Sequence, residues 1–445
     1  MNSILQLLLA GLLLSGMPTV PSTWRTGLIA VDAETGDTLM SLNARELFRP
    51  ASTVKLVTTM LALEELGPSY VYRTRILADT SARELWISGA GAPLLSGEHI
   101  RITAMETAAA LQPGSSWDLL WDSTRFTAES HCPGWEESDW SKTYCPPIEG
   151  LSVGDNIVQI VVSTLGGTMR LFHYPPLPRL VIDNGLVIGP TASVRTSVEG
   201  WSGPEPALSL SGTVPPDSFV ILYKPYPGPP AEFASMFRSE LLDRGLEVTE
   251  PRPGAPGNPA SLVQTSVILS DPLFVILSSM NKWSRNMVAD MVLRTVSLEA
   301  GNSPASTGAG CDRAAEMLTG LVPGLEGIRL ADGSGLSRHN LLAPVHLAAV
   351  LMEGTGSLEW GPEFLATLPV NGVDGTLGWR LGNLPPGAFR GKTGTLNDTC
   401  AIAGLLTASS GRRIVLVIML EPPTGYTITA RALQDSIVEW FWENY

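Results

Sequence analysis

The sequence predicts an α+β protein in which one domain of strands and helices is interrupted by a long β-rich insertion. Strand-like runs and apolar helices occur together near both ends of the chain, from 25 to 67 and again after 262. Between about 70 and 260, short strand-like pieces alternate with turns rich in Gly and Pro. The 445 residues suffice for roughly three domains of about 150 residues each, which leaves room for such an insertion.

Composition and charge exclude several classes of protein. The 29 basic and 43 acidic residues give a net charge of -14, and this charge repels the phosphates of nucleic acids. We therefore expect no nucleic-acid partner. Charged residues make up 16% and hydrophobic residues 44%, which is typical of folded domains rather than disordered chains. The five histidines show no metal-ligand spacing, so we expect no metal site.

The first residues indicate export. The apolar run from Ile4 to Leu14 is too short for a membrane span of about 20 residues, but it suits a secretory signal peptide over residues 1–23. No Lys or Arg precedes Arg25, so a buried N-terminal helix stays an alternative. No later run of 18 apolar residues occurs. We expect a periplasmic or otherwise exported protein with no transmembrane segment in the mature chain.

Four cysteines are compatible with an oxidising compartment. Cys132 and Cys145 lie in one loop rich in Pro and Trp, and they could close a small ring there. The sequence leaves open whether Cys311 and Cys400 meet.

The N-terminal part has the pattern of two strands followed by a helix. Gly27 to Asp32 and Thr38 to Leu42 are short strand-like runs separated by a turn. An apolar helix is expected from after Pro50 to Leu66, with its stop signal at Gly67.

The remaining elements are expected from the same signals. The middle should hold one helix, a boundary loop and several strands, at Ala231–Gly245, Pro251–Pro259, Leu85–Ser88, Ile157–Ser163 and Ser218–Tyr223. After 262 we expect helices at Pro272–Ala300, Cys311–Leu321 and Pro344–Glu353, strands at Phe389–Thr395, Ala401–Thr407 and Ile414–Leu420, and a final helix at Thr427–Trp442. The aromatic residues at 440–442 are expected to pack that helix onto the sheet.

Two motif matches fail because their context is wrong. Gly150-Leu151-Ser152-Val153-Gly154 has the form of the nucleophile elbow of α/β-hydrolases, but Pro146 and Pro147 cannot lie in the buried strand that must precede it. Gly391-Lys392-Thr393 ends like a phosphate-binding loop, but Pro386 stands where that motif requires Gly.

Ser52-Thr53-Val54-Lys55 stands in a context that suits catalysis. Ser52 and Lys55 are three positions apart on one face of the expected helix, so the amine can reach the hydroxyl. The helix N-terminus favours an oxyanion beside Ser52, and a lysine on a buried helix can act as a base. The plain alternative is a capping Ser and a solvated Lys, since a second S-x-x-K runs from Ser279 to Lys282.

Two further motifs shift this balance towards catalysis. Ser284-Arg285-Asn286, expected inside the helical stretch Ser279–Arg294, offers a hydroxyl and a carboxamide two residues apart. Lys392-Thr393-Gly394-Thr395 belongs to a strand end, where Gly394 permits close approach and Lys392 supplies a cation. Each alone is an ordinary polar turn or strand end. In the order S-x-x-K, S-x-N and K-T-G they form the signature of penicillin-recognising serine enzymes.

The chain resembles the penicillin-binding-protein 4 type of D-alanyl-D-alanine carboxypeptidase/endopeptidase. The 232 residues from Ser52 to Ser284 match the long insertion of that family. Further segments follow in family order over about 25 to 435, namely Gly89–Pro93, Asp122–Phe126, Pro133–Trp135, Asp155-Asn156, Asp332–Arg338 and Gly372–Leu377. The chain departs from the family pattern at Ala92 and Arg285, where the family has Asp, and Arg285 adds a cation beside the site.

The resemblance implies a serine β-lactamase/transpeptidase-like domain, with an antiparallel sheet flanked by helices, built from residues 24–76 and 262–445. It implies two small nested domains in the insertion, one from 77–157 and 247–261 and the other from 158–246. Asp122 and Phe126 could line a pocket for the substrate side chain, although a packing pair at a strand end explains them equally well.

The resemblance also implies how acyl transfer begins. Ser52 would attack the carbonyl of a terminal D-alanyl-D-alanine bond while a neutral Lys55 takes its proton, and Lys392 nearby would help to keep Lys55 neutral. Ser284 would pass a proton to the leaving amine, and Asn286 would hold Lys55 and the substrate amide. Water would then release the acyl-enzyme, and no metal or organic cofactor is required.

The K-T-G strand would bind the substrate. The N–H groups of Ser52 and Thr395 would form the oxyanion hole, and Gly394 would permit close approach to the strand backbone. The terminal carboxylate would lie against Lys392, Thr393 and Thr395. The expected partners are peptidoglycan peptides and β-lactams.

Two rival functions stay open. A related serine esterase or β-lactamase would use the same chemistry, but those enzymes usually lack the long insertion. A non-catalytic cell-wall-binding or scaffold protein of the same fold is a second rival, and the intact motif residues argue against it. The sequence does not separate carboxypeptidase from endopeptidase activity, because both use the same site, and it leaves the third stem-peptide residue and the oligomeric state open.

Overall fold

The computed structural model describes residues 16–111, 114, 116–201 and 207–445. Most of the predicted signal peptide, residues 1–15, therefore lies outside the described residues. The chain divides into two compact units. The first unit consists of the described residues up to Ser69, together with Leu273–Ala289 and Thr307–Tyr445. The second consists of Tyr70–Pro272 and Asp290–Ser306.

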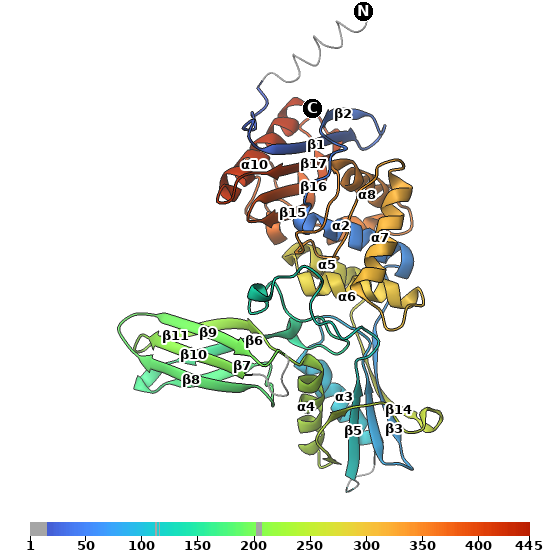
Figure 1. Ribbon diagram of the computed structural model, residues 1–445, viewed down its shortest axis with the longest axis vertical. Helices are drawn as coiled ribbons and strands as arrows, with labels where there is room; N and C mark the ends of the chain where they lie inside the picture. The colour runs from blue at the N-terminus through green and yellow to red at the C-terminus, as the bar shows by residue number, and fades with distance from the viewer. Residues whose placement is uncertain (1–15, 112–113, 115, 202–206) are drawn as a thin grey trace, which may run out of the picture. The chain divides into compact units, whose positions relative to one another are not determined.

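A five-stranded antiparallel sheet forms the centre of the first unit (Figure 1). Its order is β15-β16-β17-β1-β2, with bounds Phe389–Leu396, Thr399–Thr407, Arg413–Glu421, Arg25–Asp32 and Thr38–Leu42. Because β1 pairs with β17 from Arg25↔Glu421 to Asp32↔Ile414, the two ends of the chain build one sheet. The strands expected at both ends of the sequence are confirmed, with ends that differ by at most two residues.

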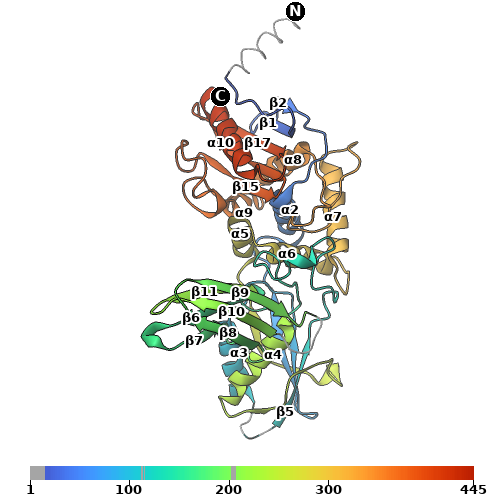
Figure 2. The same ribbon diagram turned by 60° about the vertical axis from the view of Figure 1, so that its left-hand side comes forward.

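Helices cover both faces of this sheet. Helices α8 (Pro344–Gly356) and α10 (Thr427–Asn444) pack on its strands. Helices α2, α7 and α9 pack on α8, and α5 packs on α2 and α9; their bounds are Val54–Leu66, Thr307–Leu321, Gly361–Thr367 and, for α5, Leu273–Trp283. Alternate residues of β17 are buried on opposite faces, and Ile414, Leu416, Ile418 and Leu420 share a core with α10. Trp440 and Phe441 belong to that core, so the expected packing of the terminal helix is confirmed. Figure 2 shows α10 along one side of the sheet.

Two secondary-structure predictions are wrong. The continuous helix expected over Pro272–Ala300 is broken into α5 and α6 (Asn286–Glu299), and Ser284 takes a left-handed φ of 56° between them. The apolar pattern continues across this break, so only the backbone conformation reveals it. The middle of the chain also contains a second helix, α3 (Gly97–Ala110), whose N-terminus is capped by Ser96 and His99. We missed it because His takes the position where Glu or Gln usually completes such a cap.

The second unit contains one larger sheet and two small ones. The larger sheet has the order β12-β5-β4-β3-β14, with β13 also paired to β5; the bounds are Glu247–Val248, Ser116–Asp122, Glu84–Ser88, Arg73–Asp79, Val263–Leu269 and, for β13, Arg252–Pro253. Helices α3 and α4 (Pro229–Leu242) belong to the same unit. The small sheets have the orders β11-β6-β7 and β8-β10-β9.

The strands of the small sheets occupy one lobe of the second unit (Figure 1). The bounds of β6 to β11 are Ile157–Ser163, Arg170–Tyr174, Val181–Ile188, Ser193–Glu199, Ala207–Val214 and Phe219–Pro225. The division of the insertion into two nested domains stays a prediction. All four cysteines are buried, and the possible pairing of Cys132 with Cys145 stays a prediction too. No helix in the described part of the chain is long and apolar enough to cross a membrane.

Candidate active site

Ser52 lies in a short 3-10 turn, Ala51–Thr53, that leads directly into α2. Ala51 has a left-handed φ of 47°, a conformation that costs a non-glycine residue about 1–3 kcal/mol and is common at functional sites. Two glycines hold this turn by close approach. A Cβ at Gly335 would lie 1.9 Å from the Ala51 carbonyl oxygen, and one at Gly394 would lie 2.8 Å from the Ser52 nitrogen. The backbone around Ser52 is therefore enclosed by a loop and by β15.

Lys55 is buried and its amine is held by three oxygens. Its Nζ donates to Ser52 Oγ at 3.1 Å, to Asn286 Oδ1 at 2.7 Å and to the Ser334 carbonyl oxygen at 2.6 Å. A buried lysine amine fixed at hydrogen-bond distance from a serine hydroxyl can receive the hydroxyl proton. The structure thus brings together three of the four predicted site residues of the first two motifs, Ser52, Lys55 and Asn286.

The Ser334 carbonyl is presented by a loop that folds around a buried carboxylate. Asp332 Oδ1 accepts hydrogen bonds from the N–H of Ser334 at 3.2 Å and of Gly335 at 2.6 Å, and Oδ2 accepts from the N–H of Ser337 at 2.7 Å. Asn340 Nδ2 donates to Asp332 Oδ1 at 2.9 Å. The sequence pattern placed this segment in the resemblance without assigning it a role. The position of the Ser334 carbonyl shows that this loop holds the Lys55 amine.

Ser284 and Asn286 lie at the junction of α5 and α6. The Arg285 N–H donates to the Met280 carbonyl at 3.0 Å, which closes the end of α5. Ser284 is partly exposed in the turn, whereas Asn286 is buried at the start of α6. The break in the helix therefore separates a hydroxyl at the surface of the site from a carboxamide inside it.

Lys392 is fully buried on β15, and its Nζ donates to the Thr393 carbonyl at 2.7 Å. Burial and, second, the positive charge of Lys55 hold the pKa of Lys392 well below its ordinary value. The hydroxyls of Thr393 and Thr376 lie 2.9 Å apart. Motif residues of β15 thus contribute an amine and hydroxyl groups to the same region of the first unit.

A further cation lies at the end of the K-T-G motif. Arg431 of α10 is exposed, and its Nε donates to the Thr395 hydroxyl at 3.3 Å. The sequence contains no pattern that marks Arg431, because it comes from a helix outside the three motifs. Its guanidinium adds positive charge beside the Thr395 hydroxyl, an arrangement that suits a carboxylate.

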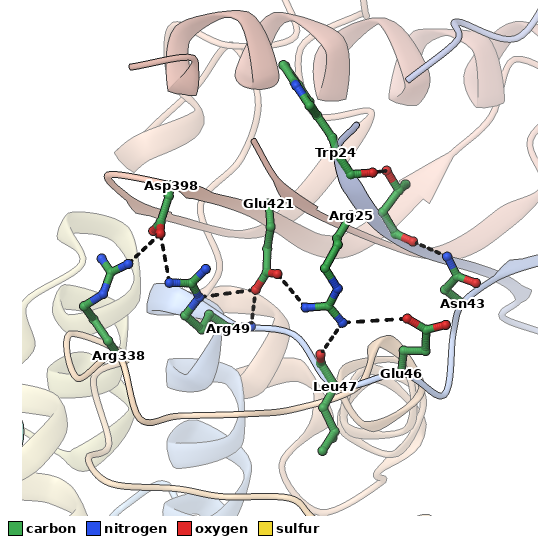
Figure 3. Close-up of polar contacts among 10 residues, drawn as sticks. Trp24, Arg25, Asn43, Glu46, Leu47, Arg49, Arg338, Asp398 and Glu421 are labelled. Carbon is green, nitrogen blue, oxygen red and sulfur yellow. Dashed lines mark hydrogen bonds and ion pairs between the residues drawn. The ribbon is translucent and has the colours of Figure 1, made fainter. Parts of the chain in front are cut away.

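An ion-pair network connects the segments that carry these residues (Figure 3). Asp398, in the turn after β15, accepts from Arg49 at 2.9 Å and from Arg338 at 2.6 Å. Glu421 of β17 accepts from Arg49 at 3.3 Å and from Arg25 at 2.6 Å. Burial acts to raise the pKa of Asp398, but the Arg338 hydrogen bond and the Arg49 charge outweigh it and lower that pKa.

The ion-pair network connects three segments of the site. Arg49 comes directly before the Ser52 turn, and Arg338 ends the loop that presents the Ser334 carbonyl. Both meet Asp398 at the end of the strand that carries Lys392. The charges therefore fix three segments that are distant in sequence in one arrangement.

The hydrolase-elbow match and the second S-x-x-K segment both have structural roles. Ser152 is buried, its Oγ donates to the Glu149 carbonyl at 3.3 Å and accepts from Asn156 Nδ2 at 3.0 Å, so it is no exposed nucleophile. Lys282 of the second S-x-x-K forms an ion pair with Asp374. In the described ranges, no group of three or more His, Cys, Asp or Glu side chains could hold a metal ion.

Comparisons with known proteins agree with this geometry. The model of the D-Ala-D-Ala carboxypeptidase 3 (S13) family matches residues 17–443. The D-alanyl-D-alanine carboxypeptidase of Actinomadura sp. (strain R39) is 29% identical over 409 residues, which cover 87% of this chain and 76% of the relative. The D-alanyl-D-alanine carboxypeptidase DacB of Haemophilus influenzae is 24% identical over 431 residues, 92% of this chain and 87% of the relative.

A solved structure supports the fold. The crystal structure of penicillin binding protein 4 (dacB) from Haemophilus influenzae matches with a TM-score of 0.78 at 22% identity, covering 97% of this chain and 98% of that chain. The expected transpeptidase-like fold and the resemblance stated from the sequence are thereby confirmed. The chain belongs to the D-Ala-D-Ala carboxypeptidase 3 (S13) family of peptidases.

Proposed function

We propose that the chain is an exported serine D-alanyl-D-alanine carboxypeptidase/endopeptidase that cleaves peptidoglycan stem peptides through an acyl-enzyme at Ser52. One observation carries this proposal: the buried Lys55 amine lies 3.1 Å from the Ser52 hydroxyl and is fixed by Asn286 and the Ser334 carbonyl. A solvated lysine and a capping serine, the plain alternative, would leave that amine in water. The family membership supports the substrate class.

Acylation joins Ser52 to the penultimate D-alanine. Ser52 Oγ attacks the carbonyl carbon of the terminal peptide bond while the Lys55 amine takes the hydroxyl proton. The N–H groups of Ser52 and Thr395 stabilise the oxyanion. Ser284 passes a proton to the leaving nitrogen and takes one from the Lys55 ammonium, so that Lys55 is neutral again, the C–N bond breaks, and D-alanine departs. A water molecule then attacks the ester, which releases the shortened peptide and returns the proton to Ser52.

Lys55 and Lys392 influence each other's protonation. Burial and the charge of Lys55 disfavour the ammonium form of Lys392, and the repulsion between the two amines acts in both directions. The site therefore disfavours two ammonium groups at once. A neutral amine at Lys55 is the form that can accept the Ser52 proton.

The carboxylate of the substrate would bind at the far end of β15. Thr393 and Thr395 supply hydroxyls, Lys392 supplies its buried amine, and Arg431 is hydrogen-bonded to Thr395. Such a subsite fits the free carboxylate next to the scissile bond of a terminal D-alanine. It also fits a β-lactam carboxylate, and one solved relative is described as complexed with a novel β-lactam.

The test is intact-mass spectrometry after incubation with benzylpenicillin. We expect one penicilloyl adduct on Ser52, absent from Ser52→Ala and retained in Ser279→Ala, which removes the serine of the second S-x-x-K. Rapid release of the adduct with hydrolysed drug would indicate a β-lactamase instead. Absence of any adduct, with the drug intact and the wild-type protein folded by circular dichroism, would favour the non-catalytic scaffold.

A further inference from the structure

The small sheet β11-β6-β7 in the second unit has one buried and one exposed side. Val158, Ile160 and Val162 of the central strand β6 are buried on one side. On the other side, the residues between them are only partly covered. A strand in this position normally places polar side chains towards solvent.

The exposed side carries large apolar and aromatic residues instead. The strand register places Tyr223, Gln159 and Tyr174 in one row across the sheet, and Ile221, Val161 and Phe172 in the next. The third row holds Phe219, Ser163 and Arg170. The exposed fractions of the large side chains are high: Phe172 58%, Tyr174 60%, Phe219 59%, Ile221 42% and Tyr223 52%. We call these rows the aromatic face.

The other small sheet provides an internal comparison. The exposed residues of its strand β9 are Ser193, Arg195, Ser197 and Glu199. On the central strand β10 they are opposed by Thr213, Ser211, Ser209 and Ala207. The surface of β9 and β10 is thus polar, with Val181 and Val187 exposed on the neighbouring strand β8, whereas the other sheet exposes a contiguous cluster of rings. Exposed clusters of this kind mark interaction sites.

The layout of the aromatic face restricts the ligand. Neighbouring strands are about 4.8 Å apart, so the rings on β11 and β7 flank the central strand at about 10 Å from each other. Gln159, Val161 and Ser163 of the central strand lie between these rings, so two hydrogen-bonding side chains and one valine occupy the middle, and large apolar groups with Arg170 occupy the sides. A protein interface usually has an apolar core and a polar rim, whereas two of the three central side chains here are polar.

Charge restricts the ligand further. Arg170 is the single charged residue of the three rows. A membrane surface would require a cluster of basic residues around the rings. The face therefore suits an uncharged, extended molecule that offers apolar surfaces to the rings and hydroxyl or amide groups to Gln159, Ser163 and the tyrosine hydroxyls.

We infer that the aromatic face binds a linear chain of N-acetylated sugars, the glycan strand that carries the stem peptides. Pyranose rings present apolar C–H faces and equatorial hydroxyl and acetamide groups, which match the two kinds of side chain in the rows. The inference rests on the proposed function for the identity of the polymer. Binding here would hold the enzyme on its polymeric substrate between cleavage events.

The experiment measures sugar binding separately from catalysis. A fluorescently labelled, neutral N-acetylglucosamine oligomer is titrated with the full chain and followed by fluorescence anisotropy, and binding to insoluble peptidoglycan is measured by sedimentation. The variant Tyr174→Ala/Tyr223→Ala removes the rings of one row. The matched control, Arg195→Ala/Ser197→Ala, changes the polar surface of the other small sheet.

We expect the double tyrosine variant to lose about tenfold or more in affinity, because two exposed rings contribute most of the contact, while the control binds as the wild type does. Single variants Phe172→Ser and Phe219→Ser should weaken binding in the same direction. Benzylpenicillin acylation should be equal in all of them. A failure of acylation in the wild type would contradict the proposed function and leave the sugar titration interpretable.

Three outcomes would overturn the inference. The wild-type chain could show no binding to either probe, or the double tyrosine variant could bind both probes as tightly as the control does. Sedimentation velocity could instead show a wild-type dimer that dissociates in the tyrosine variant, which would assign the face to a second copy of this chain.

Discussion

Lys55 Nζ and Asn286 Oδ1 lie 2.7 Å apart although 231 positions separate the two residues in the chain. Nearly all of that separation is the insertion, because the first unit ends at Ser69 and resumes at Leu273. The contact therefore depends on α2 and the start of α6 being packed in one unit. The distance between base and carboxamide is therefore set by packing within the first unit.

We predict that Asn286→Ala lowers the acylation rate by benzylpenicillin by about 10²-fold or more, because Lys55 loses an acceptor that fixes its amine. The free energy of unfolding should fall by about 1–3 kcal/mol, since a buried hydrogen bond is lost. Stopped-flow acylation and urea unfolding measure the two effects. The control is Asn383→Ala, whose exposed side chain bonds Glu439. Equal acylation by both variants would show that Asn286 does not position the base.

The sequence predicted one part of this site directly and another part only through motif order. The contact between Ser52 and Lys55 follows from their spacing on one helix, and β15 was expected at its observed position. The approach of Asn286 to Lys55 could not be derived from spacing, because it depends on how α5 and α6 pack on α2. The helix break at Ser284 was missed for a local reason, a left-handed backbone that no residue type signalled.

The loop at Ser334 shows a second limit of the sequence. Its functional atom is a backbone carbonyl, which every residue possesses, and its orientation comes from the hydrogen bonds that Asp332 accepts. Arg431 was missed because it lies on the terminal helix, whose pattern indicates packing only. Residues that act through the backbone or from outside the motifs thus require the structure.

Gly335→Ala tests how closely the loop must approach the Ser52 turn. Gly335 has a φ of 81°, and an added Cβ would lie 1.9 Å from the Ala51 carbonyl oxygen. We expect the backbone of Ser52 to shift and benzylpenicillin acylation to fall by about 10²-fold, since a displacement of about 1 Å can have that effect. Acylation kinetics on folded variant protein check this.

Gly411→Ala is the matched control for that variant. Gly411 also has a positive φ, of 88°, but an added Cβ would meet nothing within 4 Å. Both variants should lose stability, by about 1–3 kcal/mol, from the left-handed backbone alone. Only Gly335→Ala should also lose acylation. Wild-type acylation in Gly335→Ala would show that the loop can retreat without moving the nucleophile.

Arg431 is predicted to bind the substrate carboxylate. With a peptide that ends in D-alanyl-D-alanine, Arg431→Ala should raise KM by about tenfold, because a charge-assisted hydrogen bond contributes about 1.5–3 kcal/mol and exposure weakens it. With the same peptide amidated at its C-terminus, the variant and the wild type should react equally slowly. Arg390→Ala, an exposed arginine on the same strand as the motif, is the control. An equal loss on both peptides would assign Arg431 a structural role.

We predict that Lys392 lowers the free energy of unfolding at neutral pH. Burial and the charge of Lys55 lower its pKa far below the value of 10.5 that applies in the unfolded chain. At pH 7 the unfolded chain therefore binds a proton that the native state disfavours, and folding is opposed. This opposition weakens as pH rises and ends above 10.5, where Lys392 is neutral in both states. Lys392→Met, which keeps the length of the side chain, should raise the urea midpoint at pH 7.

The advantage of Lys392→Met over the wild type should be smaller at pH 10 than at pH 7, because the wild type regains stability as its unfolded chain loses the proton. Taking the difference between the two proteins cancels the titration of the groups that do not interact with Lys392. Lys282→Met is the control, since its partly exposed amine is paired with Asp374 and its removal should lower the midpoint instead. A constant difference across this pH range would show that Lys392 keeps its proton in the native state. In that case a charged Lys392 would repel an ammonium group at Lys55 and so favour its neutral, basic form.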